Sequence, residues 1–104
     1  KFSRENVFIR DDGECQYCSK NLTKQNFTLD HVVPVSQGGK KVWQNIVACC
    51  MSCNQKKGSK SLKRAGMKLL KPPTVPKELI VSKENKFNHN VPDEWKIYLG
   101  VKNV

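Results

Sequence analysis

The sequence predicts a small α+β domain in which short strands and helices are fastened by a bound metal ion. The first observation is a pair of Cys-x2-Cys motifs, Cys15–Cys18 and Cys50–Cys53, with 31 residues between them. Each motif can offer two thiolates to one tetrahedral ion, so the two together fill a structural zinc site. The second observation is that two segments typical of strands, 27–33 and 45–49, lie between the motifs. A chain of 104 residues builds only a small core, which makes such a fastening useful.

The fifth cysteine leaves an alternative open. An odd number of cysteines argues against a disulfide framework, although two reactive or disulfide-bonded pairs remain the competing interpretation of the motifs. Cys49 could replace Cys50 as a ligand through a three-residue spacing to Cys53. We expect instead that Cys49 is a buried free thiol.

The other elements follow from capping and breaking residues. Residues 4–12 are predicted to form a helix with Ser3 as its N-cap, Gly13 at its end, and Val7 and Phe8 facing inward. The elements expected after it are a turn that forms the first zinc knuckle (14–21), a strand stopped by Pro34 (27–33), a loop (34–41), a second strand (45–49) and a helix that ends at Gly58 (51–57).

The last third of the chain differs in composition. Residues 71–76 carry three prolines and are expected to be a stiff extended link. A final helix is predicted to begin at Pro92 and to pack its apolar face on the domain, while His89 is interpreted as solvent-exposed. We therefore expect a domain over 1–71 and a C-terminal extension over 72–104.

The charge of the chain is concentrated in its middle. The net charge is +10, and the stretch between Asp30 and Glu78 holds ten basic residues and no acidic one. Such a surface attracts a polyanion and releases its counterions, which predicts a nucleic-acid partner. The alternative is a solvated lysine-rich face that only keeps the protein in solution. No apolar run approaches the ~18 residues of a membrane span, and no signal peptide is visible, so we expect a cytoplasmic protein without a membrane partner.

The motifs that carry chemistry follow a recognisable order. They are Cys15-x2-Cys18, Leu29-Asp30-His31-Val32-Val33-Pro34 with Gly38-Gly39, Trp43-Gln44-Asn45-Ile46-Val47, and Cys50-x2-Cys53-Asn54-x-Lys56-x-Gly58. This order resembles the HNH endonucleases of the small bacterial or phage type, closely over residues 4–60. The resemblance implies the ββα-metal nuclease fold with a four-cysteine zinc site and flanking helices. It also implies Zn²⁺ as a structural cofactor, Mg²⁺ or Mn²⁺ as a catalytic one, and DNA as the substrate in a bacterial or phage-infected cell.

The resemblance also assigns roles to four residues. His31 would be the general base, Asp30 and Asn54 would hold one catalytic divalent ion, and Asn45 would fix the loop and steady the His31 ring. The side chains suit these roles, because phosphodiester hydrolysis needs a water deprotonated near neutral pH and histidine ordinarily titrates near pH ~6.5. Two oxygen ligands with one negative charge favour Mg²⁺ or Mn²⁺. Many members have histidine where Asn54 stands, and histidine would favour softer metals.

The alternation of side chains along a strand argues against Asp30 and His31 pointing to the same side. Neighbouring side chains on a strand point to opposite faces, so Asp30 and His31 are expected to diverge. For both side chains to act on the same phosphate, either the strand has to be distorted or a metal ion has to bridge the bound phosphate.

DNA contacts are expected mainly with the phosphate backbone. The helix over 51–57 would lie against the minor groove or the scissile phosphate, as the resemblance implies. The candidate contacts are Lys40, Lys41, Lys56, Lys57, Lys60, Lys63 and Arg64. Since backbone contacts carry no sequence information, we expect low sequence specificity. Nicking by a monomer is the simpler expectation, with double-strand cleavage and a homodimer as alternatives.

Two other functions remain open from the sequence. The first is a zinc-braced nucleic-acid-binding module whose nuclease site is silent. The complete set of Asp30, His31, Asn45 and Asn54 argues against it, because a silent module has little need of all four. The second is a nuclease or toxin directed at RNA.

Overall fold

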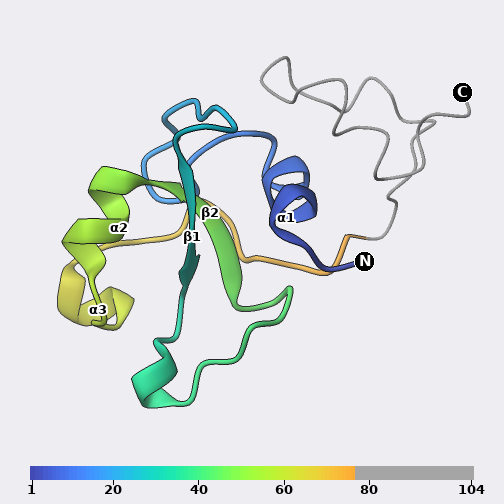
Figure 1. Cartoon of the computed structure of the whole chain (residues 1–104). Helices are drawn as coiled ribbons and strands as arrows, with labels where there is room; N and C mark the ends of the chain where they lie inside the picture. Colours follow the sequence, from blue (N-terminus) through green and yellow to red (C-terminus); the bar gives the residue numbers. More distant parts are fainter. Residues whose placement is uncertain (77–104) are drawn as a thin grey trace, which may run out of the picture.

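The computed structural model describes residues 1–76, in which short elements follow one another along the chain (Figure 1). They are α1 (Arg4–Arg10), β1 (Phe27–His31), the 3-10 helix η1 (Val35–Gln37), β2 (Ile46–Cys50), α2 (Met51–Lys57) and α3 (Leu62–Ala65). No helix in residues 1–76 is long and apolar enough to cross a bilayer. The helix expected after Pro92, and His89, lie outside the described residues, so the domain boundary at residue 71 stays a prediction.

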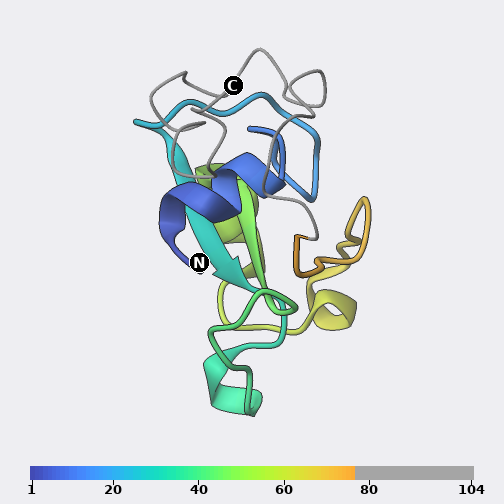
Figure 2. The same ribbon diagram turned by 90° about the vertical axis from the view of Figure 1, so that its right-hand side faces the viewer.

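The centre of the fold is an antiparallel pair of strands followed directly by a helix. β1 pairs with β2 in a register that places Phe27 opposite Cys50 and His31 opposite Ile46. α2 begins at Met51, the residue after β2 ends. α1 lies on one side of the two strands, and α2 and α3 lie on the other (Figures 1 and 2). The α+β fold with flanking helices is therefore confirmed.

The helices begin and end where their capping residues predict, with one difference. The Ser3 hydroxyl accepts a hydrogen bond from the Asn6 N–H, which confirms the N-cap of α1. α1 ends at Arg10 instead of residue 12, because Asp12 adopts a left-handed φ of 62° that no helix continues through. α2 spans the predicted 51–57 and is capped by Gly58 at φ 56°.

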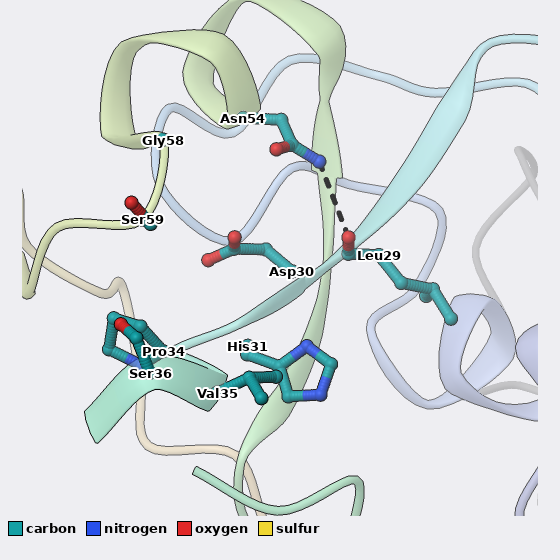
Figure 3. Close-up of a pocket in the computed structure, with 9 residues that line it drawn as sticks. All are labelled: Leu29, Asp30, His31, Pro34, Val35, Ser36, Asn54, Gly58 and Ser59. Atoms are coloured by element: carbon teal, nitrogen blue, oxygen red, sulfur yellow. Dashed lines mark hydrogen bonds between the residues drawn. The ribbon is translucent and has the colours of Figure 1, made fainter. Parts of the chain in front are cut away.

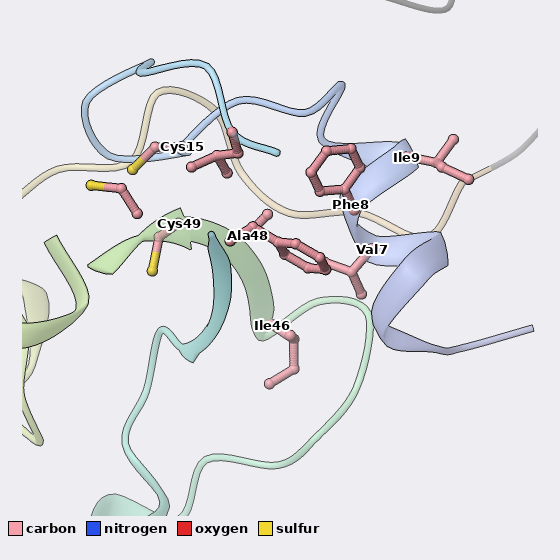
Figure 4. Packing of buried hydrophobic residues seen from close by; sticks show 10 residues of the cluster. Val7, Phe8, Ile9, Cys15, Ile46, Ala48 and Cys49 are labelled. Carbon is pink, nitrogen blue, oxygen red and sulfur yellow. The ribbon is translucent and has the colours of Figure 1, made fainter. Parts of the chain in front are cut away.

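A small apolar core fills the space between α1 and the sheet (Figure 4). Val7 and Phe8 are fully buried, and Phe8 meets Phe27 edge to face with ring centroids 4.7 Å apart. Ile46 and Ala48 belong to the same cluster. Because α1 covers this side, the other side of the sheet is left for α2 and the polar side chains of β1.

The loop between the strands is held by one asparagine side chain. β1 ends at His31 instead of residue 33, since the Asn45 Oδ1 accepts from the Val33 N–H (2.8 Å) and the Nδ2 donates to the Val33 carbonyl (3.1 Å). The same Nδ2 also donates to the Lys40 carbonyl at 3.0 Å. Gly39 allows this close packing, because a Cβ there would come within 1.7 Å of the Val33 oxygen. The segment from β1 to β2 therefore has a defined course as it projects from the body of the fold (Figure 2).

Truncation of the central aromatic residue should show how much the small core contributes. Phe8→Ala is expected to lower the free energy of unfolding by about 3–5 kcal/mol, because it removes the ring that Phe27 contacts and leaves a cavity. Urea unfolding followed by circular dichroism measures the change. Val35→Ala is the control, since this side chain is 67% exposed and its loss should cost under about 0.5 kcal/mol. Equal losses in the two variants would contradict this account of the core.

Candidate metal and catalytic site

The four predicted ligand sulfurs come together between the knuckle and the start of α2. The Sγ atoms of Cys15, Cys18, Cys50 and Cys53 all lie within 4.8 Å of one another. The Cys18 and Cys50 sulfurs are 3.8 Å apart, close to the edge of a tetrahedron whose metal–sulfur bonds measure about 2.3 Å. Four thiolates suit a soft tetrahedral ion. The donor set therefore fits a metal such as zinc.

The structure also decides between Cys49 and Cys50. Burial raises the pKa of the Cys49 thiol to about 12, although its hydrogen bond with Thr28 opposes the shift. Burial likewise raises the pKa of Cys50, but hydrogen bonds from the Cys53 N–H and the other thiols bring it below its ordinary value. The Sγ atom of Cys50 belongs to the four-sulfur cluster and that of Cys49 does not, so Cys50 is the candidate ligand. The prediction that Cys49 is a buried free thiol is confirmed.

A hollow of about 550 Å³ opens at the end of β1, where the strand, the η1 segment and α2 meet (Figure 3). Three of the four candidate catalytic residues line it. The lining residues are Leu29, Asp30, His31, Pro34, Val35, Ser36, Asn54, Gly58 and Ser59.

Asp30 is held by two donors on a single oxygen. The Tyr17 hydroxyl donates to its Oδ2 at 2.6 Å, and the Lys57 Nζ lies 3.1 Å from the same atom. Burial, together with the hydrogen bond and the charge of Asp30, raises the pKa of Tyr17 well above its usual range, so this hydroxyl remains a donor. The Oδ1 atom has no hydrogen-bond partner within residues 1–76. Asp30 can therefore offer that oxygen to a cation.

Asn54 is fixed with its oxygen free. Its Nδ2 donates to the Thr28 Oγ1 at 2.9 Å and to the Leu29 carbonyl at 3.3 Å. In Figure 3 the Nδ2 faces β1, while the Oδ1 points to the side on which the Asp30 carboxylate lies. The two oxygen donors thus fit a hard divalent ion better than a soft one, because neither offers nitrogen or sulfur.

His31 leaves the strand on the opposite face from Asp30. β1 is paired without interruption up to His31, so the strand is not distorted. The imidazole points to the same side as Leu29 and away from the Asp30 carboxylate (Figure 3). The divergence expected from strand alternation is therefore present. Both side chains still line the hollow, because His31 is the last residue of β1.

Asn45 acts on the backbone, not on the imidazole. Its side chain fixes Val33 and Lys40, as described above, and its carbonyl accepts from the Val32 N–H at 2.8 Å. Within residues 1–76 the His31 ring makes no hydrogen bond. Asn45 thus fixes the loop that follows His31 and makes no hydrogen bond to the ring.

The comparison with known proteins agrees with this arrangement. Residues 15–70, more than half of the chain, match the HNH endonuclease family. The chain belongs to the HNH endonuclease family. The match covers both cysteine pairs, the hollow and the β1–β2–α2 unit.

A longer HNH-family relative is similar over part of the chain. The CRISPR-associated endonuclease Cas9 of Corynebacterium diphtheriae is 41% identical over 51 residues. These residues are 48% of this chain and 5% of that protein, so the chain spans about one twentieth of the length of its relative.

Lys57 is not placed as the sequence predicted. The residue is only 1% exposed, and its Nζ donates to the His31 carbonyl at 2.7 Å besides pairing with Asp30. Asn54 and Lys57 lie three residues apart on one helix face, and that face packs against β1. The expectation that Lys57 contacts DNA phosphate is therefore wrong in this HNH domain. The other candidates are exposed: Lys40, Lys41, Lys56, Lys60, Lys63 and Arg64.

Two residues that hold the site were missed by the sequence reasoning. Tyr17 lies in the segment predicted to form the knuckle, and Thr28 lies in a predicted strand. Strand alternation could have identified Thr28 as a residue near the site, because its side chain lies on the same face of the strand as that of Asp30. A tyrosine between two metal ligands was a weaker signal, although a buried tyrosine hydroxyl usually has a partner.

Removal of one ligand sulfur should remove the zinc and unfold the domain. Cys53→Ser is expected to reduce bound zinc from one ion per chain to almost none, and to abolish the cooperative unfolding transition, because the core alone is small. Zinc content by atomic absorption and thermal unfolding by circular dichroism measure both effects. Cys49→Ser is the matched control and should retain one zinc per chain. A folded Cys53→Ser variant without zinc would contradict the structural role.

Proposed function

We propose that the chain is a metal-dependent DNA endonuclease that hydrolyses phosphodiester bonds with low sequence specificity. The observation that carries the proposal is the hollow at the end of β1, because His31, Asp30 and Asn54 all line it. An imidazole and two oxygen donors around one opening are the groups that cation-assisted phosphodiester hydrolysis uses.

His31 accepts the proton of the attacking water. The water oxygen then forms a bond to phosphorus, and the bond to the 3′ oxygen breaks. This leaves a 5′-phosphate and a 3′ oxyanion, which takes a proton from solvent water to become the 3′-hydroxyl. Asp30 and Asn54 hold Mg²⁺ or Mn²⁺, which supplies positive charge beside the phosphate and leaving-group oxygens when bound. Because β1 is not distorted, the scissile phosphate has to sit at the end of the strand to reach both faces.

The basic residues around the hollow bind the phosphate backbone. Lys40 and Lys41 follow η1, and Lys56 is exposed on α2. α2 has only seven residues and no arginine, which leaves little means to distinguish base edges. Backbone binding and low specificity are therefore proposed together. The hollow at the end of β1 would give each chain one site that cuts one strand, which suits nicking by a monomer.

One observation favours the alternative of a silent binding module. The His31 ring points away from the Asp30 carboxylate, so the two groups do not meet without substrate. A zinc-braced module with this geometry would bind nucleic acid and cut nothing. The assay below separates the two functions.

Supercoiled plasmid should become nicked when Mg²⁺ or Mn²⁺ is added to the zinc-loaded protein. His31→Ala and Asn54→Ala are each expected to slow nicking by at least about 100-fold, because they remove the proton acceptor and a cation ligand. Gel electrophoresis of the plasmid measures the rate. Gln55→Ala is the matched control, since it is an exposed neighbour on the same helix and should nick like the wild type.

Three outcomes would contradict the proposal. If neither ion supports nicking, and His31→Ala binds plasmid like the wild type, the chain is a binding module. If His31→Ala nicks at the wild-type rate, the general base is another group. If a matched RNA is cut faster than DNA, the substrate class is wrong.

The lysines after η1 should control how DNA affinity depends on salt. The double change Lys40→Ala and Lys41→Ala is expected to reduce the slope of log affinity against log salt by about 1.8, since each phosphate contact contributes roughly 0.9. Fluorescence anisotropy of a labelled duplex, measured without divalent ions, gives the slope. Lys20→Ala, which lies outside the acid-free stretch, should keep the wild-type slope. An unchanged slope in the double variant would mean that Lys40 and Lys41 do not contact the DNA phosphates.

A further inference from the structure

Tyr17 connects two sites that are separate in the sequence. Its backbone N–H donates to the Cys15 Sγ at 3.4 Å, so its main chain is tied to a ligand sulfur of the zinc cluster. Its hydroxyl donates to the Oδ2 atom of Asp30 at 2.6 Å, and Asp30 is one of the residues that line the hollow at the end of β1. The residue therefore contacts the thiolate cluster at one end and the carboxylate at the other.

Tyr17 and Lys57 together determine which oxygen of Asp30 is available. Both approach Oδ2, and the Lys57 Nζ is further fixed by the His31 carbonyl at 2.7 Å. Asp30 as a whole is only 7% exposed, so little water can replace a lost donor. With Oδ2 occupied, Oδ1 is the atom that Asp30 offers to the hollow.

We propose that Tyr17 is a positioning residue that couples the zinc knuckle to the cation site by holding Asp30 with Oδ1 toward the hollow. The inference rests on the proposed function, because it takes Asp30 as a ligand of the divalent ion. Hydrogen bonds to metal ligands commonly fix the ligand orientation, and their loss weakens metal binding. The zinc ion would thus support the second metal site through one tyrosine, in addition to its role in the fold.

Lys57 alone does not supply the same restraint. Its ammonium group is a point charge on a flexible four-carbon stem, whereas the tyrosine hydroxyl is carried by a rigid ring. The ammonium also places positive charge near the cation, which opposes cation binding. The hydroxyl is neutral and directs Asp30 without that repulsion. Loss of the hydroxyl should therefore weaken cation binding even though Lys57 remains.

The test measures Mn²⁺ binding directly, without DNA or turnover. Zinc-loaded wild-type protein, Tyr17→Phe and Ser19→Ala are titrated with Mn²⁺, and free Mn²⁺ is read by electron paramagnetic resonance. Ser19→Ala is the matched control, because it removes a hydroxyl from the same knuckle, and no hydrogen bond within residues 1–76 joins this hydroxyl to Asp30. Tyr17→Phe is expected to raise the Mn²⁺ Kd by about tenfold or more. Ser19→Ala should bind Mn²⁺ like the wild type.

Two further readouts separate positioning from a general structural role. Tyr17→Phe should keep one zinc per chain and the wild-type affinity for a duplex without divalent ions, since the ring and the lysines remain. Tyr17→Met is measured in parallel, because it removes the hydroxyl by a different change and should give the same rise in Kd. Zinc loss that accompanies the change in Mn²⁺ affinity in both variants would overturn the positioning role.

The outcomes distinguish this inference from the function on which it rests. If wild-type protein binds Mn²⁺ and nicks DNA, but Tyr17→Phe and Tyr17→Met bind Mn²⁺ within twofold of it, only the coupling is wrong. If wild-type protein binds no Mn²⁺ and nicks nothing, the cation site fails and the coupling fails with it. A rise in Kd in both variants, with zinc and duplex binding unchanged, supports the coupling.

Discussion

The convergence of four sulfurs is the constraint on which the other parts of this structure depend. Cys15 and Cys18 belong to a turn near the N-terminus, whereas Cys50 and Cys53 flank the start of α2. One bound ion would join these segments more strongly than the small core can, because a chain of this size buries limited apolar area. The junction fixes where α2 starts against β1. That placement brings Asn54 and Lys57 to the polar face of the strand.

Burial of a lysine beside an aspartate sets the electrostatics of the site. Lys57 and Asp30 balance each other's charge within the protein, and both have further hydrogen bonds. An unpaired buried charge would cost several kcal/mol, so neither residue can be changed alone without penalty. The balance also means that the hollow has little net negative charge with which to attract a cation. A bound phosphate would add negative charge and would strengthen the binding of the cation.

Much of the fold and part of the site could be predicted from local signals. The cysteine spacing predicted the four sulfurs that come together, and Ser3 and Gly58 marked helix ends that the structure reproduces. Strand alternation correctly separated Asp30 from His31. The end of β1 was placed two residues too late, because the Asn45 side chain takes the hydrogen bonds that a longer ladder would need. Side-chain competition of this kind leaves no periodic signal in the sequence.

The sequence by itself determined the four cysteines that cluster, the order of the elements and the family, because these depend on the spacing of residue types along the chain. Only the tertiary structure decided which of two adjacent lysines meets solvent and which oxygen of Asp30 is free. Lys56 and Lys57 have the same chemistry and neighbouring positions, yet one is exposed and the other buried. The difference arises from the face of α2 that packs on β1, and that face is set by contacts between segments distant in sequence.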